Sequence, residues 1–134
     1  MPRLASTPDG RRVEVHEPVA APRDRVWELF RDTETWAEWG PSVREVESPD
    51  RYVAAGTEGR VRTVAGLWLP FAVRTCADYR WTWNVAKLPA TGHRVEARAG
   101  GCTAVIEIPL PGAAYAPVCE RGLRRLRELA EATD

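Results

Sequence analysis

The chain has 134 residues, of which 44% are hydrophobic and 28% are charged. This composition is typical of one globular domain and excludes a disordered or fibrous protein. The 19 basic and 19 acidic side chains give a formal net charge of zero. That balance argues against nucleic acid as a partner, because phosphate binding requires an excess of cations. It argues equally against a polybasic membrane anchor.

The cysteines and the N-terminus indicate the compartment. Cys76, Cys102 and Cys119 are an odd number and lie far apart, and only two histidines accompany them. We therefore expect buried, reduced thiols, and neither a metal nor a cofactor. Residues 1–12 are polar, and no apolar run approaches the length that spans a bilayer. The sequence predicts a cytoplasmic protein without membrane insertion.

The first residues predict a loose lead-in and then a strand. Residues 1–10 end in the turn signal Pro-Asp-Gly and show no clear pattern of their own. Residues 11–19 alternate apolar and polar side chains, as a half-buried strand does. The period then changes, which marks the end of the strand.

Two short helices are predicted next. Residues 22–31 carry apolar side chains at helical spacing, with Pro22 suited to the first helical position. Residues 34–39 form the second helix, and either Asp32 or Thr33 can cap its free N–H groups.

The middle of the chain predicts an antiparallel meander. Short alternating segments are separated by turn residues at intervals of about 8 to 12 residues. The predicted strands cover residues 43–47, 59–65, 68–76, 79–86, 92–99 and 102–110. With residues 11–19 they make a sheet of about seven strands.

A long helix closes the chain. It is predicted over about residues 113–133, beginning near Tyr115 because Pro117 is tolerated only in a first turn. One face carries an apolar stripe of Tyr115, Val118, Cys119, Gly122, Leu126, Leu129 and Ala130. Residues 1–134 thus form one α+β domain, in which a curved sheet wraps around this helix. A single helix cannot fill such a sheet, so the interior requires large plugs or a ligand.

The order of these elements resembles the SRPBCC superfamily, which includes START lipid-transfer domains, the birch-pollen-allergen type and the polyketide cyclase/dehydrase group. The last of these is the most similar. The resemblance covers residues 11–132. It rests on residues 21–32, residues 36–43, Gly56-Thr57, the strands around Phe71 and Trp81, residues 93–96, residues 100–103 and the closing helix. It implies the helix-grip fold and an internal apolar ligand, but no particular activity.

The chain holds six tryptophans, which either fill the core or line the cavity. Alternation places Phe71 and Val73 inward and leaves Arg74 and Cys76 outward. The ligand-binding candidates are Trp39, Thr63, Phe71, Val73, Trp81, Trp83, His93, Tyr115 and Leu126.

Two of these candidates could also move a proton. An inward His93 could act as a general acid or base near neutral pH, and the Tyr115 hydroxyl could polarise a ligand carbonyl. Arg62 and Arg74 would reach an anionic ligand group only if a bulge shifted the register. Glu107 shares a face with Thr103 and is expected in solvent.

Three functions remain open. The first is a carrier or binding domain for an apolar small molecule such as a lipid or polyketide-like metabolite. The second is a cyclase or dehydratase that uses the same cavity with His93 or Tyr115. The third is a protein-interaction module, for which the cavity would be filled by its own side chains. We expect a monomer or a homodimer.

Overall fold

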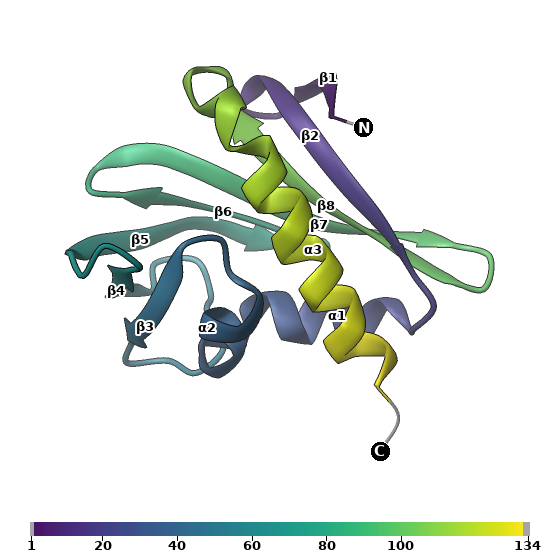
Figure 1. The fold of residues 1–134 in the computed structure, drawn as a ribbon, viewed down its shortest axis with the longest axis horizontal. Coiled ribbons are helices and arrows are strands. Elements are labelled where there is room, and N and C mark those ends of the chain that lie inside the picture. Colours follow the sequence, from purple (N-terminus) through teal and green to yellow (C-terminus); the bar gives the residue numbers. More distant parts are fainter. Residues whose placement is uncertain (1, 133–134) are drawn as a thin grey trace.

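The computed structural model describes residues 2–132 as an open antiparallel sheet that curls around a long helix (Figure 1). The sheet has eight strands in the order β1-β2-β8-β7-β6-β5-β4-β3. Their bounds are β1 Arg3–Thr7, β2 Gly10–Val19, β3 Val43–Glu47, β4 Glu58–Thr63, β5 Trp68–Ala77, β6 Arg80–Val85, β7 Leu88–Arg98 and β8 Gly101–Pro109. The predicted α+β helix-grip class is confirmed, with eight strands rather than about seven.

The helices lie close to their predicted positions. They are α1 Arg23–Arg31, a 3₁₀ turn Thr33–Thr35, α2 Trp36–Trp39, a second 3₁₀ turn Leu110–Tyr115 and α3 Ala116–Glu131. The Asp32 side chain accepts a hydrogen bond from the Glu34 amide at 3.0 Å, as a cap should. Pro22 precedes α1 with ψ of 146° and so is not its first helical residue. The predicted end at Thr133 lies outside the described residues.

The additional strand is β1, in the segment predicted to be a loose lead-in. It pairs with β2 from Arg3–Glu14 to Thr7–Gly10. Thr7 closes the turn, since its hydroxyl donates to the Gly10 carbonyl and accepts from the Asp9 amide. The apolar residue of β1, Leu4, is 57% exposed. Because β1 has no buried face, its sequence shows no alternation of apolar and polar residues.

Strand β7 begins four residues earlier than predicted. The turn before it consists of Ala86 and Lys87, both with positive φ (52° and 68°). Positive φ at both central residues is the conformation of a tight hairpin turn that glycine and asparagine usually mark. Because neither residue is a turn signal, the sequence contains no sign of a two-residue turn here, and the next strand was predicted to begin only at Gly92.

A bulge in β5 overturns the prediction that Cys76 faces outward. The register with β6 shifts between Val73 and Thr75, which puts Cys76 opposite the buried Trp81. The Cys76 thiol donates to the Val53 carbonyl at 3.6 Å. One extra residue reverses the facing of every side chain after it.

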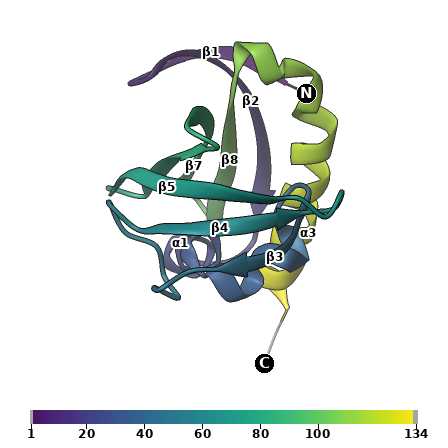
Figure 2. The ribbon, with the colours of Figure 1, turned by 90° about the vertical axis from the view of Figure 1, so that its left-hand side faces the viewer.

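Helix α3 lies against the concave side of the sheet, across β2 and beside α2 (Figure 2). Gly122 allows the close approach to α2, because a Cβ there would lie 2.7 Å from the Trp39 carbonyl oxygen. Leu123 and Leu126 are fully buried beneath it. The helix therefore fills one end of the curved sheet and leaves the other end to aromatic side chains.

The face of the sheet away from α3 carries a buried ionic cluster, which corrects the prediction for Glu107. The Glu107 side chain is only 2% exposed and accepts hydrogen bonds from Arg80 at 2.7 Å and Arg94 at 2.9 Å. Arg94 also binds Glu14, and Arg80 binds Asp9. Alternation correctly placed Glu107 away from the core, but these arginine side chains cover it.

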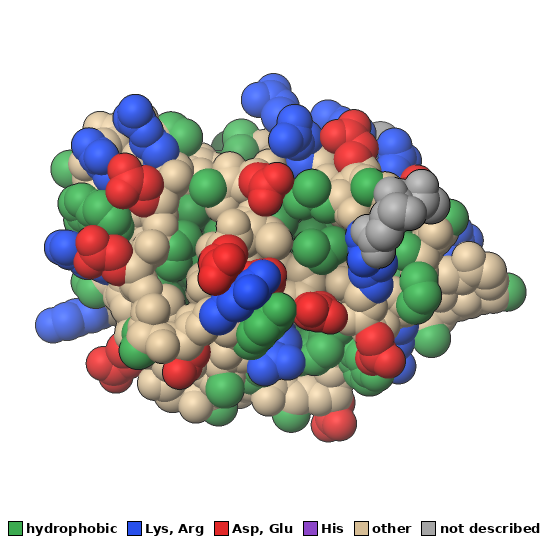
Figure 3. Space-filling view, turned by 90° about the horizontal axis from the view of Figure 1, so that it is seen from below, with side chains coloured by type: hydrophobic (Ala, Val, Ile, Leu, Met, Phe, Trp, Pro, Cys, Tyr) green, Lys and Arg blue, Asp and Glu red, His purple; other side chains and the backbone are tan. Residues whose placement is uncertain are grey.

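The surface elsewhere mixes charges of both signs. On the side seen in Figure 3, which includes α1 and α2, basic and acidic side chains are interspersed with apolar ones. No helix within residues 2–132 is both long and apolar enough to cross a membrane.

Candidate functional site

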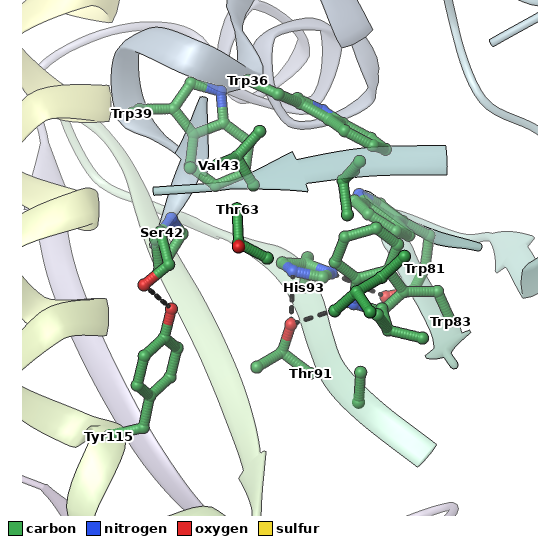
Figure 4. A pocket seen from close by; sticks show the side chains of 16 residues that line it. Trp36, Trp39, Ser42, Val43, Thr63, Trp81, Trp83, Thr91, His93 and Tyr115 are labelled. Carbon is green, nitrogen blue, oxygen red and sulfur yellow. Dashed lines mark hydrogen bonds between the residues drawn. The ribbon is translucent and has the colours of Figure 1, made fainter. Parts of the chain in front are cut away.

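A pocket of about 240 Å³ lies between the β4–β7 half of the sheet, α2 and the start of α3 (Figure 4). Its lining consists of Trp36, Trp39, Gly40, Pro41, Ser42, Val43, Val61, Thr63, Leu69, Trp81, Trp83, Val85, Ala90, Thr91, His93 and Tyr115. None of these described residues is Asp, Glu, Lys or Arg. The pocket is thus an apolar space with a few hydroxyl groups, which suits an uncharged ligand.

Stacked aromatic rings form the deep wall. Trp81 lies between Trp36 and His93, with ring centroids 5.4 Å and 4.0 Å apart and interplanar angles of 5° and 21°. Trp83 stands edge-on to Trp36 and Trp81. Rings that pack on one another in this way hold each other's rotamers, so the wall is preformed.

A chain of hydrogen bonds fixes the tautomer of His93. Its Nδ1 lies 3.3 Å from the Trp81 carbonyl oxygen, which can only accept, so Nδ1 carries the proton. Nε2 then accepts from the Thr91 hydroxyl at 2.9 Å, and that hydroxyl accepts the Trp83 indole N–H at 3.1 Å. Both ring nitrogens are satisfied by a neutral imidazole.

Burial and this bonding keep His93 uncharged. Desolvation lowers the pKa of His93 to about 3. At neutral pH the ring has no second proton to give, and its lone pair is occupied by Thr91. The arrangement favours a structural and wall-forming role over proton transfer near pH 7.

Two hydroxyls meet at the mouth of the pocket. The Tyr115 hydroxyl at the start of α3 lies 2.5 Å from the Ser42 hydroxyl, which follows α2 (Figure 4). Ser42 has φ of 60°, an uncommon conformation for a residue other than glycine. Burial raises the pKa of Tyr115, although the bond with Ser42 opposes this shift, so the phenol keeps its proton. This Tyr115–Ser42 hydrogen bond, here named the latch, connects the start of α3 to the α2–β3 connection.

The structure brings six of the predicted wall residues together at the pocket: Trp39, Thr63, Trp81, Trp83, His93 and Tyr115. The other three, Phe71, Val73 and Leu126, do not line it but lie in the core, at most 3% exposed. Phe71 is covered by Trp36 and Trp83, with ring centroids 5.6 Å and 5.5 Å away.

Ten of the sixteen described lining residues were not among the predicted ligand-binding residues, and three of the ten take part in the ring stacking and hydrogen bonds of the site. Trp36 was visible as an aromatic at helical spacing, but its inward direction depends on the short α2. Ser42 and Thr91 carried no signal, since their roles arise from backbone conformation and from contact with residues distant in the chain.

Other candidate chemistry lies elsewhere. Arg62 pairs with Glu45 and Arg74 with Asp9, and neither lines the pocket. All three cysteines are free thiols, and burial raises the pKa of Cys119 to about 12. Within residues 2–132 no group of three His, Cys, Asp or Glu side chains is arranged to hold a metal.

The helix-grip architecture defines a class of α+β proteins, and comparison with known proteins specifies the family. A profile described as polyketide cyclase/dehydrase and lipid transport matches residues 10–131. The chain belongs to this family, within the SRPBCC superfamily that its sequence resembles. No curated protein matches it at a significant level.

Solved structures share the fold at low sequence identity. Protein CV1439 from Chromobacterium violaceum is 21% identical with a TM-score of 0.66, over 90% of this chain and 96% of that one. The KanY protein is 12% identical with a TM-score of 0.71, over 89% and 96%. The di-domain ARO/CYC protein StfQ of the steffimycin biosynthetic pathway is 13% identical with a TM-score of 0.67, over 88% of this chain and 49% of that one.

Proposed function

We propose that the protein binds an apolar small molecule with aromatic character, whose uncharged part lies in the pocket between α2, α3 and the sheet. The observation that carries the proposal is a preformed cavity of about 240 Å³ walled by Trp81, Trp83 and Trp39 without a charged residue among its described lining. At about 30 Å³ per water molecule this space equals about eight waters, so it holds one or two rings of a ligand, such as the naphthalene of a larger compound. The open volume also favours a ligand site over an interaction module, for which a filled cavity was expected.

The polar groups of the pocket are suited to orienting a ligand rather than to reacting with it. The Thr91 oxygen can accept one further hydrogen bond from a ligand O–H or N–H group. The Ser42 hydroxyl, which accepts from Tyr115, still has its own proton to donate to a ligand oxygen. Such sparse groups fix how an apolar ligand sits.

The test compares two variants on the same strand. Ala90→Trp fills the pocket, whereas Ala97→Trp adds the same side chain at an exposed position of β7. Titration with the uncharged fluorophore phenylnaphthylamine should show saturable binding to the wild type and to Ala97→Trp, and a loss of at least tenfold in affinity for Ala90→Trp. Equal affinities for the two variants would contradict a ligand site in this pocket.

A cyclase or dehydratase acting in the same pocket is the second candidate, favoured by the hydroxyl pair at its mouth. A protonated Tyr115 would turn its O–H from Ser42 to a ligand carbonyl while the aromatic walls hold the chain folded. If this is correct, Tyr115→Phe should abolish conversion of a short poly-β-ketone and leave its binding within about threefold. Absence of any conversion by the wild type would leave the binding function alone.

A further inference from the structure

Next to the pocket the sheet opens between β7 and β8. The backbone pairing of these strands ends at Gly92 and Glu107, and β7 before Gly92 pairs with β6 alone. If the pairing of β7 with β8 continued beyond Gly92 and Glu107, it would include Pro89 of β7 and Pro109 of β8. Neither proline has an N–H to donate to the other strand. In Figure 1 β8 runs up toward the start of α3 while the β6–β7 hairpin turns to the left. A groove of about 660 Å³ occupies this opening.

The groove is apolar and adjoins the pocket. Leu88 and Leu110 line it with 67% and 47% of their surface exposed. It shares Ala90, Thr91 and Tyr115 with the lining of the pocket. The pocket and the groove therefore border the same three residues, so the groove lies where a ligand too long for the pocket would extend.

Two arginines give the groove its charge. Arg11 and Arg12 line its β2 side. The Arg12 guanidinium donates to the Arg11 carbonyl at 3.0 Å, and within residues 2–132 neither side chain forms an ion pair. No Asp or Glu stands among the groove's described lining residues. The two cations thus keep donors for an oxyanion, which guanidinium groups bind with paired hydrogen bonds.

We infer that the groove is the second half of the ligand site and that it selects an amphipathic organic anion. The apolar body of the ligand lies in the pocket, and its carboxylate or comparable oxyanion lies in the groove against Arg11 and Arg12. This inference rests on the proposed function, because it assigns a charged end to the same ligand. It explains why an apolar surface that includes Leu88 and Leu110 is left open beside two arginines.

A pair of probes that differ by one charge tests the inference. Anilinonaphthalene sulfonate has the same ring system as phenylnaphthylamine and adds a sulfonate. The wild type should bind the sulfonate more tightly, and Arg11→Gln/Arg12→Gln should reduce this preference by roughly three- to tenfold, as expected for two partly exposed ion pairs. Affinity for phenylnaphthylamine should stay unchanged, which also shows that the variant is folded.

The matched control is Arg121→Gln/Arg124→Gln, which removes the same charge from the exposed face of α3. It should keep the wild-type preference. If both double variants reduce the preference equally, or neither reduces it, the anionic subsite is wrong although the pocket stands. If the wild type binds neither probe, the proposed function itself has failed.

Discussion

The most informative single change is Glu107→Gln, because the sequence predicts an exposed side chain and the structure buries it. The amide keeps the size of the carboxylate but removes its charge from between Arg80 and Arg94. Breaking a buried ion pair costs about 3 to 5 kcal/mol. We expect the substitution to lower the free energy of unfolding by about 3 kcal/mol, the low end of this range. The reason is that Arg80 still pairs with Asp9, and Arg94 still pairs with Glu14.

The assay is urea or thermal unfolding followed by tryptophan fluorescence. A loss of that size lowers Tm by roughly 10 °C in a domain of this length. The control Glu45→Gln removes a carboxylate that is 50% exposed and paired with Arg62, and it should stay close to the wild type. Equal, small effects of the two substitutions would refute the buried cluster.

The pH dependence adds a second readout. Burial raises the pKa of Glu107, but the hydrogen bonds from Arg80 and Arg94 outweigh this and hold the pKa below its usual 4.5. A lowered pKa in the folded state gives stability that is present above pH 4.5 and is lost as the pH falls through the folded value. The difference between wild type and Glu107→Gln should therefore be full at pH 7 and shrink below pH 4.5. A difference that does not change with pH would contradict the role of the charge.

Three further changes test other parts of the structure. Gly122→Ala should destabilise the fold by about 1 to 3 kcal/mol in urea unfolding, because its Cβ would lie 2.7 Å from the Trp39 carbonyl oxygen; an unchanged midpoint would contradict the close α2–α3 packing. Tyr115→Phe removes the hydrogen bond to Ser42, so the release rate of phenylnaphthylamine in stopped-flow experiments should increase by about fivefold. This factor corresponds to the loss of one hydrogen bond of about 1 kcal/mol. An unchanged release rate would contradict the role of this hydrogen bond in holding the ligand. The ring signals of His93 should not titrate between pH 8 and pH 5 in NMR spectra. The pKa of His93 is about 3 in the folded state and ordinarily 6.5, so the free energy of unfolding decreases as the pH falls below 6.5. An NMR titration midpoint near pH 6.5 for the ring of the folded protein would contradict its burial.

Much of the architecture could be predicted because it depends on patterns that are local in the chain. Alternation identified the strands from β2 onward, and helical spacing identified α1, α2 and α3. Where these signals were absent the prediction was wrong. Strand β1 buries no face of its own, and the Ala86–Lys87 turn uses residues that do not mark turns.

The site was harder to predict, because its geometry depends on register and on distant contacts. Parity put Trp81 and Trp83 on the same face of their strand but left open whether that face, or His93, points inward; in the structure all three line the pocket. Parity could not show that Phe71 would be covered by Trp36, or that the bulge after Val73 would turn Cys76 inward. The Thr91–His93 and Ser42–Tyr115 bonds join side chains whose meeting requires the whole fold.

The most direct test of the central claim is an NMR titration with naphthalene, read from the indole N–H signals of the tryptophans. The ligand-pocket account predicts saturable shifts of Trp81 and Trp83, which line the pocket, while Trp27 and Trp68 stay unchanged because they do not line it. Shifts of Trp27 or Trp68 that equal those of the pocket tryptophans, or no saturable shift at all, would contradict it.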